Sequence, residues 1–206
     1  TLHGRIRPAA AKNSVLPLLA ATLLCRTPSR LRAVPPLADV ATSLALLQSV
    51  GAKAERQGSD LFVAPGQDLQ GEIPDYLAGA MRSSVFYLAP LLCRVGEVRL
   101  PLPGGCKLGP RPVDIHLAGL AAMGAQVELE GIAVTLRRRG PLHGVDFALR
   151  LPSVGATMTL MMAATQAGGT TILRGAACEP EICDLANFLR ACGAHIAGAG
   201  TPVVVI

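Results

Sequence analysis

The sequence predicts one α/β domain made of three copies of a βαβαββ unit, with apolar helices buried inside and small sheets outside, an inside-out α/β barrel. Three observations predict it. A helix-ending pattern recurs at Gly51, Gly124 and Gly193, about 70 residues apart. Each copy begins with a helix that is apolar on every side, as helices of a protein core are. Each copy ends in two short extended runs across a polar or glycine-containing turn.

The elements follow one another in the same order in each copy. The apolar helices are expected over residues 14–25, 83–93 and 156–167. Strands are expected after the second and third of these helices, over residues 97–102 and 170–174. An amphipathic helix then ends at each glycine, and the paired extended runs cover residues 52–56 with 61–64, 126–130 with 133–137, and 195–196 with 203–206.

An aspartate stands near the start of every amphipathic helix, as Asp39, Asp114 and Asp184. A short acceptor side chain at this place satisfies free backbone N–H groups and opposes the helix dipole. We therefore expect Asp39 and Asp184 to be N-terminal caps. Asp114 can either cap its helix in the same way or belong to a functional site.

The repeats set the expected domain boundaries. Three units are expected over residues 12–66, 67–139 and 140–206, and no stretch between them has the composition of a flexible linker.

Composition narrows the class of protein. Half of the 206 residues are hydrophobic, enough for a sizeable core, yet the longest apolar run, residues 15–25, is about half of what a membrane-spanning helix requires. Residues 1–11 lack the apolar segment of a signal peptide. The net charge of +5 suits an anionic partner. Because the chain has two Tyr, four Phe and no Trp, we expect a phosphorylated small molecule rather than nucleic acid.

Six cysteines in a chain of this length do not form a disulfide-dense scaffold. A zinc site at Cys178, Cys183 and Cys192 is conceivable, but their spacings match none of the usual ligand patterns. We expect no metal, no cofactor and free thiols in a reducing cytoplasm.

Residues 103–114 form the most informative stretch, because they place Cys106 in a glycine-rich turn between two glycines and Lys107, with Arg111 close behind. Glycines allow a close approach of backbone N–H groups to a ligand, and nearby cations make a thiol more reactive. A cysteine is more often a small buried hydrophobic residue. The density of glycines and cations around Cys106 favours a chemical role.

Five short motifs occur in order along the chain. They are Ala-Lys-Asn at 11–13, Met-Arg-Ser-Ser at 81–84, Pro-Gly-Gly-Cys at 103–106 leading to Arg-Pro-Val-Asp-Ile-His at 111–116, Ser-Val-Gly-Ala-Thr at 153–157, and Glu-Pro-Glu-Ile-Cys-Asp at 179–184. Through them the chain resembles the enolpyruvyl transferases nearly end to end, most closely the branch that uses UDP-N-acetylglucosamine. The branch that makes 5-enolpyruvylshikimate 3-phosphate carries Lys-Ser where Lys12 and Asn13 stand, and lacks the cysteine loop.

The resemblance implies transfer of the enolpyruvyl group of phosphoenolpyruvate to the 3′-hydroxyl of UDP-N-acetylglucosamine with release of phosphate. This is the first committed step of bacterial peptidoglycan synthesis. It implies that Cys106 is the general acid, that Lys12 and Asn13 bind phosphoenolpyruvate, and that Arg111 contacts both ligands. The UDP-sugar residues that it implies are Arg82, Arg111, Pro112, Val113, Asp114, Ile115, Leu151, Pro152, Ser153, Val154 and Gly155. It also implies a second domain, absent from this chain, that supplies the aspartate base. Residues 1–11 are then expected to be the end of a strand of that domain, and the chain to be an excised domain or one half of a divided enzyme.

Two departures from the family pattern bear on the nucleotide. Leu151 stands where well-known members carry a basic residue, and Cys178 replaces the arginine often found before Glu-Pro-Glu, so weaker nucleotide binding is expected. Three other functions compete with this assignment. They are a catalytically inactive module that binds anions or nucleotide sugars, a transferase of the 5-enolpyruvylshikimate 3-phosphate type, and a structural repeat protein. A pure binder needs the cations Lys12 and Arg111 but no acid, and a structural repeat protein does not explain why glycines cluster in one copy only.

Overall fold

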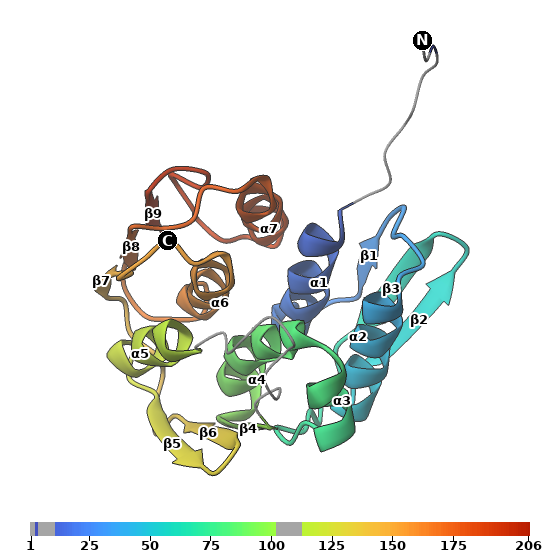
Figure 1. Cartoon of the computed structure of the whole chain (residues 1–206), viewed down its shortest axis with the longest axis horizontal. Helices are drawn as coiled ribbons and strands as arrows, with labels where there is room; N and C mark the ends of the chain where they lie inside the picture. Colours follow the sequence, from blue (N-terminus) through green and yellow to red (C-terminus); the bar gives the residue numbers. More distant parts are fainter. Residues whose placement is uncertain (1–2, 4–10, 102–112) are drawn as a thin grey trace.

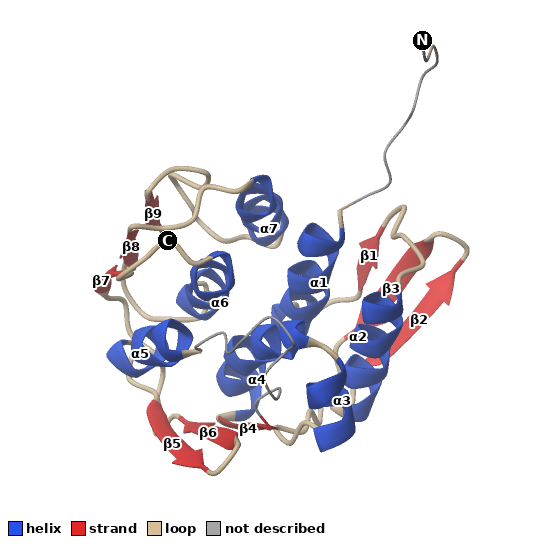
Figure 2. Ribbon diagram, viewed as in Figure 1, coloured by secondary structure: helices blue, strands red, loops and turns tan. Residues whose placement is uncertain are grey.

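The computed structural model describes residues 3, 11–101 and 113–206, with helices in the middle and small sheets around them (Figure 1, Figure 2). The helices are α1 (Lys12–Ala21), η1 (Thr22–Leu24), α2 (Ala38–Ser49), α3 (Asp75–Ala80), η2 (Arg82–Tyr87), α4 (Leu88–Val95), α5 (Asp114–Ala122), α6 (Val154–Ala164) and α7 (Pro180–Ala191), where η marks a 3₁₀ helix. The strands are β1 (Ser29–Leu31), β2 (Lys53–Gln57), β3 (Asp60–Ala64), β4 (Glu97–Pro101), β5 (Gln126–Glu130), β6 (Ala133–Arg137), β7 (Asp146–Ala148), β8 (Ile172–Arg174) and β9 (Val203–Val205).

Over the described ranges, the strands form three separate three-stranded sheets and no closed barrel. Their strand orders are β1-β3-β2, β4-β6-β5 and β7-β8-β9. In each sheet, the strand that follows an inner helix lies antiparallel to the last strand of the same unit, as β1 with β3, β4 with β6 and β8 with β9. In the third sheet, β7 precedes the inner helix in sequence and pairs in parallel with β8. In the second copy, Glu72 makes a corresponding parallel bridge to Arg99 of β4.

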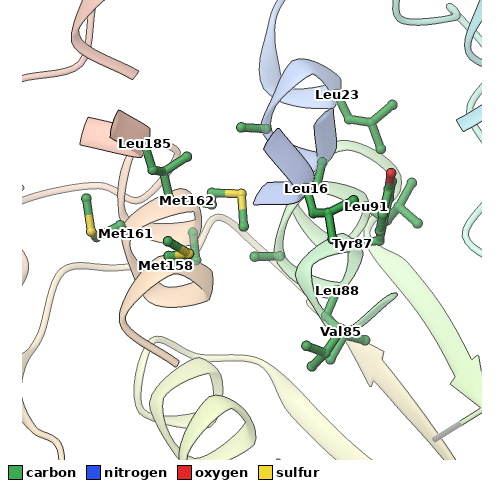
Figure 3. Close-up of a cluster of buried hydrophobic side chains, with 14 of the residues drawn as sticks. Leu16, Leu23, Val85, Tyr87, Leu88, Leu91, Met158, Met161, Met162 and Leu185 are labelled. Carbon is green, nitrogen blue, oxygen red and sulfur yellow. The ribbon is translucent and has the colours of Figure 1, made fainter. Parts of the chain in front are cut away.

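The inner helices α1, α4 and α6 carry the core. In α6, every residue from 156 to 164 is buried, because α4, α5 and α7 all pack against it. Side chains of α6 and α7 lie opposite those of α1, η2 and α4 in the core (Figure 3). The labelled members of this cluster are Leu16, Leu23, Val85, Tyr87, Leu88, Leu91, Met158, Met161, Met162 and Leu185. The predicted arrangement of apolar helices inside and sheets outside is confirmed.

The amphipathic helices end as the glycine pattern predicts. Gly51, Gly124 and Gly193 have φ values of +95°, +102° and +101°, in the left-handed region that costs other residues free energy. In each case the next residue donates its N–H to the carbonyl five residues back, at 2.9 to 3.0 Å. This pairing is the Schellman motif, and it turns the chain from each helix into the following extended run.

All three predicted inner helices have different boundaries in the structure, and the one expected over residues 156–167 is α6 (Val154–Ala164). The helix expected over residues 83–93 is divided into η2 and α4, because a proline ring at residue 90 would clash with the carbonyl of residue 86 in a continuous α-helix. Pro90 lies instead in the first turn of α4, where its missing N–H costs nothing. The helix expected over residues 14–25 begins earlier, at Lys12, and finishes in the 3₁₀ turn η1.

The third copy has a shorter hairpin than expected. Residues 195–196 are not a strand. The strand-like pairing in this hairpin is limited to an antiparallel bridge between Ala197 and Val205. Gly198 and Gly200, with φ of +72° and +84°, turn the chain back immediately after that bridge. No room is left for a five-residue strand such as β2 or β5.

The three copies close into a ring, because each inner helix packs against the amphipathic helix of the preceding copy. The Ser43 hydroxyl of α2 hydrogen-bonds the buried Tyr87 hydroxyl of η2. Gly119 of α5 faces Leu160 of α6 so closely that a Cβ there would lie 2.4 Å from the leucine side chain. The ring closes where α1 packs against α7, which lies at the other end of the sequence.

Candidate active site

The start of α1 is held between α2 and α7. Lys12 forms an ion pair with Asp39 in the first turn of α2. Asn13 donates a hydrogen bond of 3.2 Å to Glu181 of α7, and the Ser14 hydroxyl donates one of 2.5 Å to Asp184. The two residues predicted to bind phosphoenolpyruvate therefore lie side by side, where three helices meet.

These contacts correct the capping predictions for Asp39 and Asp184. The N-cap residues of α2 and α7 are Leu37 and Glu179, and neither makes a side-chain cap bond. Pro180 fills the first position of α7, so Asp184 lies a full turn inside the helix. Both carboxylates are instead engaged by α1, which the local sequence cannot indicate.

Asp114 is also not an N-cap. It is the first residue of α5, after the N-cap Val113, and it accepts two hydrogen bonds from Arg150, at 2.7 and 3.1 Å. The hydrogen bond from Arg150 lowers the pKa of Asp114, so this carboxyl group is ionised at pH 7. The pair joins the start of α5 to the segment that leads into α6.

The start of α6 follows the pattern expected for an anion-binding turn. Ser153 is the N-cap, and its hydroxyl accepts a hydrogen bond of 3.3 Å from the Ala156 N–H. The backbone N–H groups of the first helical turn point toward this end, which is also the positive end of the helix dipole. Leu151 and Pro152 are exposed just ahead of it.

Gly155 allows α5 and α6 to approach closely at their starts. A Cβ at this position would lie 2.8 Å from Nε2 of His116 and 4.0 Å from the ring of Phe86. His116 is 7% exposed, and among the residues that the structure describes neither ring nitrogen has a hydrogen-bond partner. Burial lowers the pKa of His116 to about 4. The imidazole is therefore neutral at pH 7. Phe86 belongs to η2, whose first residue is the half-buried Arg82.

The starts of the helices gather at one end of the molecule. Ala177, just before α7, donates its N–H to the Thr157 hydroxyl in the first turns of α6, at 3.1 Å. The start of α7 in turn contacts the start of α1, and the start of α5 contacts that of α6. We call this region the helix-start end, comprising residues 12–14, 39, 82–86, 113–116, 150–157 and 177–184. Several helix dipoles present their positive ends there, which favours anionic ligands.

The structure places most predicted site residues at the helix-start end, in two sets. Lys12 and Asn13 form one set, and the second comprises Arg82, Val113, Asp114, Ile115, Leu151, Pro152, Ser153, Val154 and Gly155. The two sets are connected indirectly: Asn13 contacts Glu181 of α7, and Ala177, just before α7, contacts Thr157 of α6. Over the described ranges, no hydrogen bond or ion pair links the two sets directly. Cys106, Arg111 and Pro112 lie outside the described residues, and the described chain resumes at the start of α5.

Five side chains at the helix-start end were not assigned to the site from the sequence: Asp39, His116, Arg150, Glu181 and Asp184. Three of these, His116, Glu181 and Asp184, lie inside the motifs at 111–116 and 179–184. The motifs therefore marked these positions, although residue type alone gave no reason to assign them to the site. Asp39 and Arg150 carry no such signal. Their roles depend on partners distant in sequence.

The described part of the chain contains neither a membrane-spanning helix nor a metal-binding group of side chains. None of its helices has both the length and the apolar character needed to cross a bilayer. Within the same residues, no group of three or more His, Cys, Asp or Glu side chains has a geometry suited to a metal ion.

Comparison with known proteins identifies the class. The family model described as EPSP synthase (3-phosphoshikimate 1-carboxyvinyltransferase) matches residues 1–206. The solved enolpyruvyl transferase NikO from Streptomyces tendae superposes with a TM-score of 0.86 at 25% identity, over 100% of this chain and 48% of its own. An EPSP synthase from Acinetobacter baumannii superposes with a TM-score of 0.77 at 17% identity, over 98% of this chain and 47% of its own, a likeness of fold. The chain belongs to the EPSP synthase family of enolpyruvyl transferases, as its motifs predicted.

Within that family, the curated relatives carry one name. UDP-N-acetylglucosamine 1-carboxyvinyltransferase from Cellvibrio japonicus is 46% identical over all 206 residues, which correspond to 49% of its length. The protein of the same name from Gloeobacter violaceus is 48% identical over the whole chain and 45% of its own length. The chain thus spans about half the length of the curated relatives it matches.

Proposed function

We propose that this chain is the cysteine-bearing domain, with its three repeats over residues 12–206, of an enzyme that transfers the enolpyruvyl group of phosphoenolpyruvate to the 3′-hydroxyl of UDP-N-acetylglucosamine. The observation that carries the proposal is the match of 44–48% identity, over the whole of this chain, to relatives of that name. The EPSP synthases with solved structures are only 16–17% identical, which disfavours shikimate 3-phosphate as the acceptor. The proposed setting is the bacterial cytoplasm, at the first committed step of peptidoglycan synthesis.

The proposed phosphoenolpyruvate site is built on the start of α1. Lys12 brings a positive charge and Asn13 an amide group, and the contacts with Asp39 and Glu181 keep both side chains in place. A bound trianion needs such cations and N–H donors, because an unpaired charge away from water is costly. Arg111 is proposed to add a second cation, and Cys106 to protonate the methylene carbon of phosphoenolpyruvate.

The proposed UDP-sugar site lies on the starts of α5 and α6. The Ser153-Val154-Gly155 turn offers backbone N–H groups and a helix dipole to the diphosphate. Arg82 is proposed to supply the charge on this side, as the family resemblance implies. Residues 113–115 are proposed to contact the nucleotide. Leu151 is exposed beside the turn without a charge, which agrees with the weaker nucleotide binding expected from the sequence.

The proposed reaction also needs a base to remove the proton of the acceptor hydroxyl. At the helix-start end, Asp39, Asp114, Glu181 and Asp184 are each engaged by Lys12, Arg150, Asn13 or Ser14. The exposed Glu179 is the N-cap residue of α7, where the helix dipole stabilises its ionised form. A paired carboxylate is a weak base, since its partner stabilises the ionised form. We therefore propose that the base comes from a second domain, which is the partner expected from the family resemblance.

Turnover in a chimera tests the proposal. The chimera carries this chain in place of the matching 49% of the Cellvibrio japonicus enzyme. It should release phosphate from phosphoenolpyruvate when UDP-N-acetylglucosamine is present, whereas the 206-residue chain alone should not, because acid–base catalysis supplies about 10²–10⁴-fold of the rate.

The two assays separate the alternatives. Phosphate release with shikimate 3-phosphate but not with the UDP-sugar would make the chain an EPSP-type transferase. Binding of UDP-N-acetylglucosamine without turnover in a folded chimera would make it a binding module. Turnover by the chain alone would show that one of the paired carboxylates at the helix-start end is the base.

A second prediction concerns the thiol. Family members are alkylated by phosphonate epoxides of the fosfomycin type at the position matching Cys106, so this residue should be labelled first among the six cysteines. Peptide mapping by mass spectrometry measures the ratio of labelling between sites. Cys178 is the control, because it is exposed at the helix-start end but its sequence neighbours are not the glycines and cations that flank Cys106. Equal labelling of Cys106 and Cys178 would contradict the proposed anion site beside Cys106.

A further inference from the structure

Two thiols meet at the opposite end of the α1–α7 contact. Cys25 follows η1, the 3₁₀ turn that continues α1, and Cys192 is the C-cap residue of α7. Their sulfur atoms are 3.5 Å apart, although the residues are 167 positions apart in sequence. At the other end of the same two helices, Asn13 contacts Glu181 and Ser14 contacts Asp184. The helices are therefore parallel and are joined at both ends.

The backbone on both sides of this thiol pair is fixed. Arg94 donates hydrogen bonds to the carbonyls of Leu23 and Cys25, at 2.6 and 3.1 Å. Cys192 is held by N–H bonds to the carbonyls of Phe188 and Leu189, directly before the Schellman turn at Gly193. Because a disulfide needs its sulfurs at about 2.05 Å, the remaining approach is about 1.5 Å, within reach of side-chain rotation.

The pair is also accessible. Cys192 is exposed and Cys25 is half-buried, so a small reagent can reach at least one sulfur directly. Burial and the hydrogen bond with Cys25 raise the pKa of Cys192 to about 12, so at pH 7 Cys192 is a protonated thiol beside its neighbour. Both thiols stay reduced until an oxidant reaches them.

We propose that Cys25 and Cys192 are a redox-modification site, at which a small disulfide such as oxidised glutathione converts the two thiols into an intramolecular disulfide that locks α1 to α7. In the first step one cysteine sulfur attacks the glutathione disulfide, whose S–S bond breaks and releases one reduced glutathione. In the second step the other cysteine sulfur attacks the mixed disulfide and releases the second glutathione. The two cysteines are oxidised, one glutathione disulfide is reduced, and the two thiol protons end on the two glutathione molecules.

The cross-link closes a loop of most of the chain, and its effect should be large. Constraining such a loop restricts the unfolded state, so oxidation should raise the melting temperature by roughly 5–15 °C. The polar contacts of Asn13 and Ser14 with α7 remain as they are in the reduced protein. The modification therefore strengthens a contact between helices that already exists, without a new fold.

The experiment treats the purified 206-residue chain with oxidised glutathione, then measures free thiols, non-reducing peptide maps and the melting curve. In the peptide map Cys25 and Cys192 should both lose their free thiols, a peptide joining Cys25 to Cys192 should appear, and dithiothreitol should reverse both changes. Cys192→Ser should abolish the cross-link and the rise in melting temperature. Cys178→Ser removes another exposed thiol and should leave both intact.

Three results would overturn the proposal. One is a stable glutathione adduct on Cys25 or Cys192 without a cross-link between them. Another is a cross-link that joins a different pair of cysteines, and the third is a Cys25–Cys192 cross-link that leaves the melting temperature unchanged. Because the peptide map of the unaltered chain decides the first two, the test stands even if the Cys192→Ser protein does not fold. None of the readouts depends on enolpyruvyl transfer, so the proposed function and this site can fail independently.

Discussion

Replacing Lys12 with alanine in the chimera should lower kcat/KM for phosphoenolpyruvate by about 10²–10³-fold, the loss typical of removing one pre-placed group that stabilises developing charge. The Lys12 ammonium is held at the start of α1 by Asp39, so it needs no rearrangement to meet an anion. The side chain is 52% exposed, and surface ion pairs contribute at most about 1 kcal/mol to stability. The melting temperature should therefore change little while activity falls.

Lys53→Ala is the matched control for this experiment. Lys53 is an exposed lysine at the start of β2, away from the helix-start end, so its removal changes the net charge equally. Steady-state kinetics with phosphoenolpyruvate as the varied substrate measures both proteins. If the two variants lose the same activity, the effect of Lys12 is one of overall charge and the phosphoenolpyruvate site lies elsewhere.

A large loss of stability is expected for Gly144→Ala. A Cβ at Gly144 would lie 2.2 Å from the Thr170 carbonyl oxygen and 2.8 Å from its backbone nitrogen. Thr170 has little freedom to move away, because the next residue exchanges two hydrogen bonds of 2.9 Å with Ile206. Forcing an atom into such a contact costs about 3 kcal/mol, and the melting temperature should fall by roughly 6–12 °C.

Gly140→Ala provides the comparison. Gly140 lies four residues earlier in the same segment, and no atom is within 4 Å of the position its Cβ would take. The same substitution there should change stability by less than about 0.5 kcal/mol. Thermal unfolding followed by circular dichroism distinguishes the two variants. Similar melting temperatures for both would mean that the segment before β7 can shift relative to β8.

The sequence predicted the parts of the fold that depend on local preference. Gly51, Gly124 and Gly193 were predictable, because a left-handed helix end selects glycine whatever lies around it. The apolar helices were predictable because a helix without a polar face has no stable place at a surface. The break before α4 was missed, although Pro90 contained the information needed to predict it.

The candidate site was less predictable from local rules. Family motifs located Lys12, Asn13 and the turn at Ser153, and the structure places all three at the helix-start end. Local capping rules failed for Asp39 and Asp184, because each carboxylate is drawn to a residue of α1. A tertiary partner some 170 residues away overrides a weak preference for the helix end. Only the folded chain brings those partners together.

The ring of helices has a consequence for how the protein is made. The hydroxyl of Ser14 meets its partner Asp184 only after 170 further residues have left the ribosome. At about 5–20 residues per second, this delay is roughly 10–30 s. During that time the flank of α1 that will face α7 has no cover, while the contacts of α1 with α2 are already available. The nascent chain thus carries α1 without its α7 neighbour until residues 180–191 have been made.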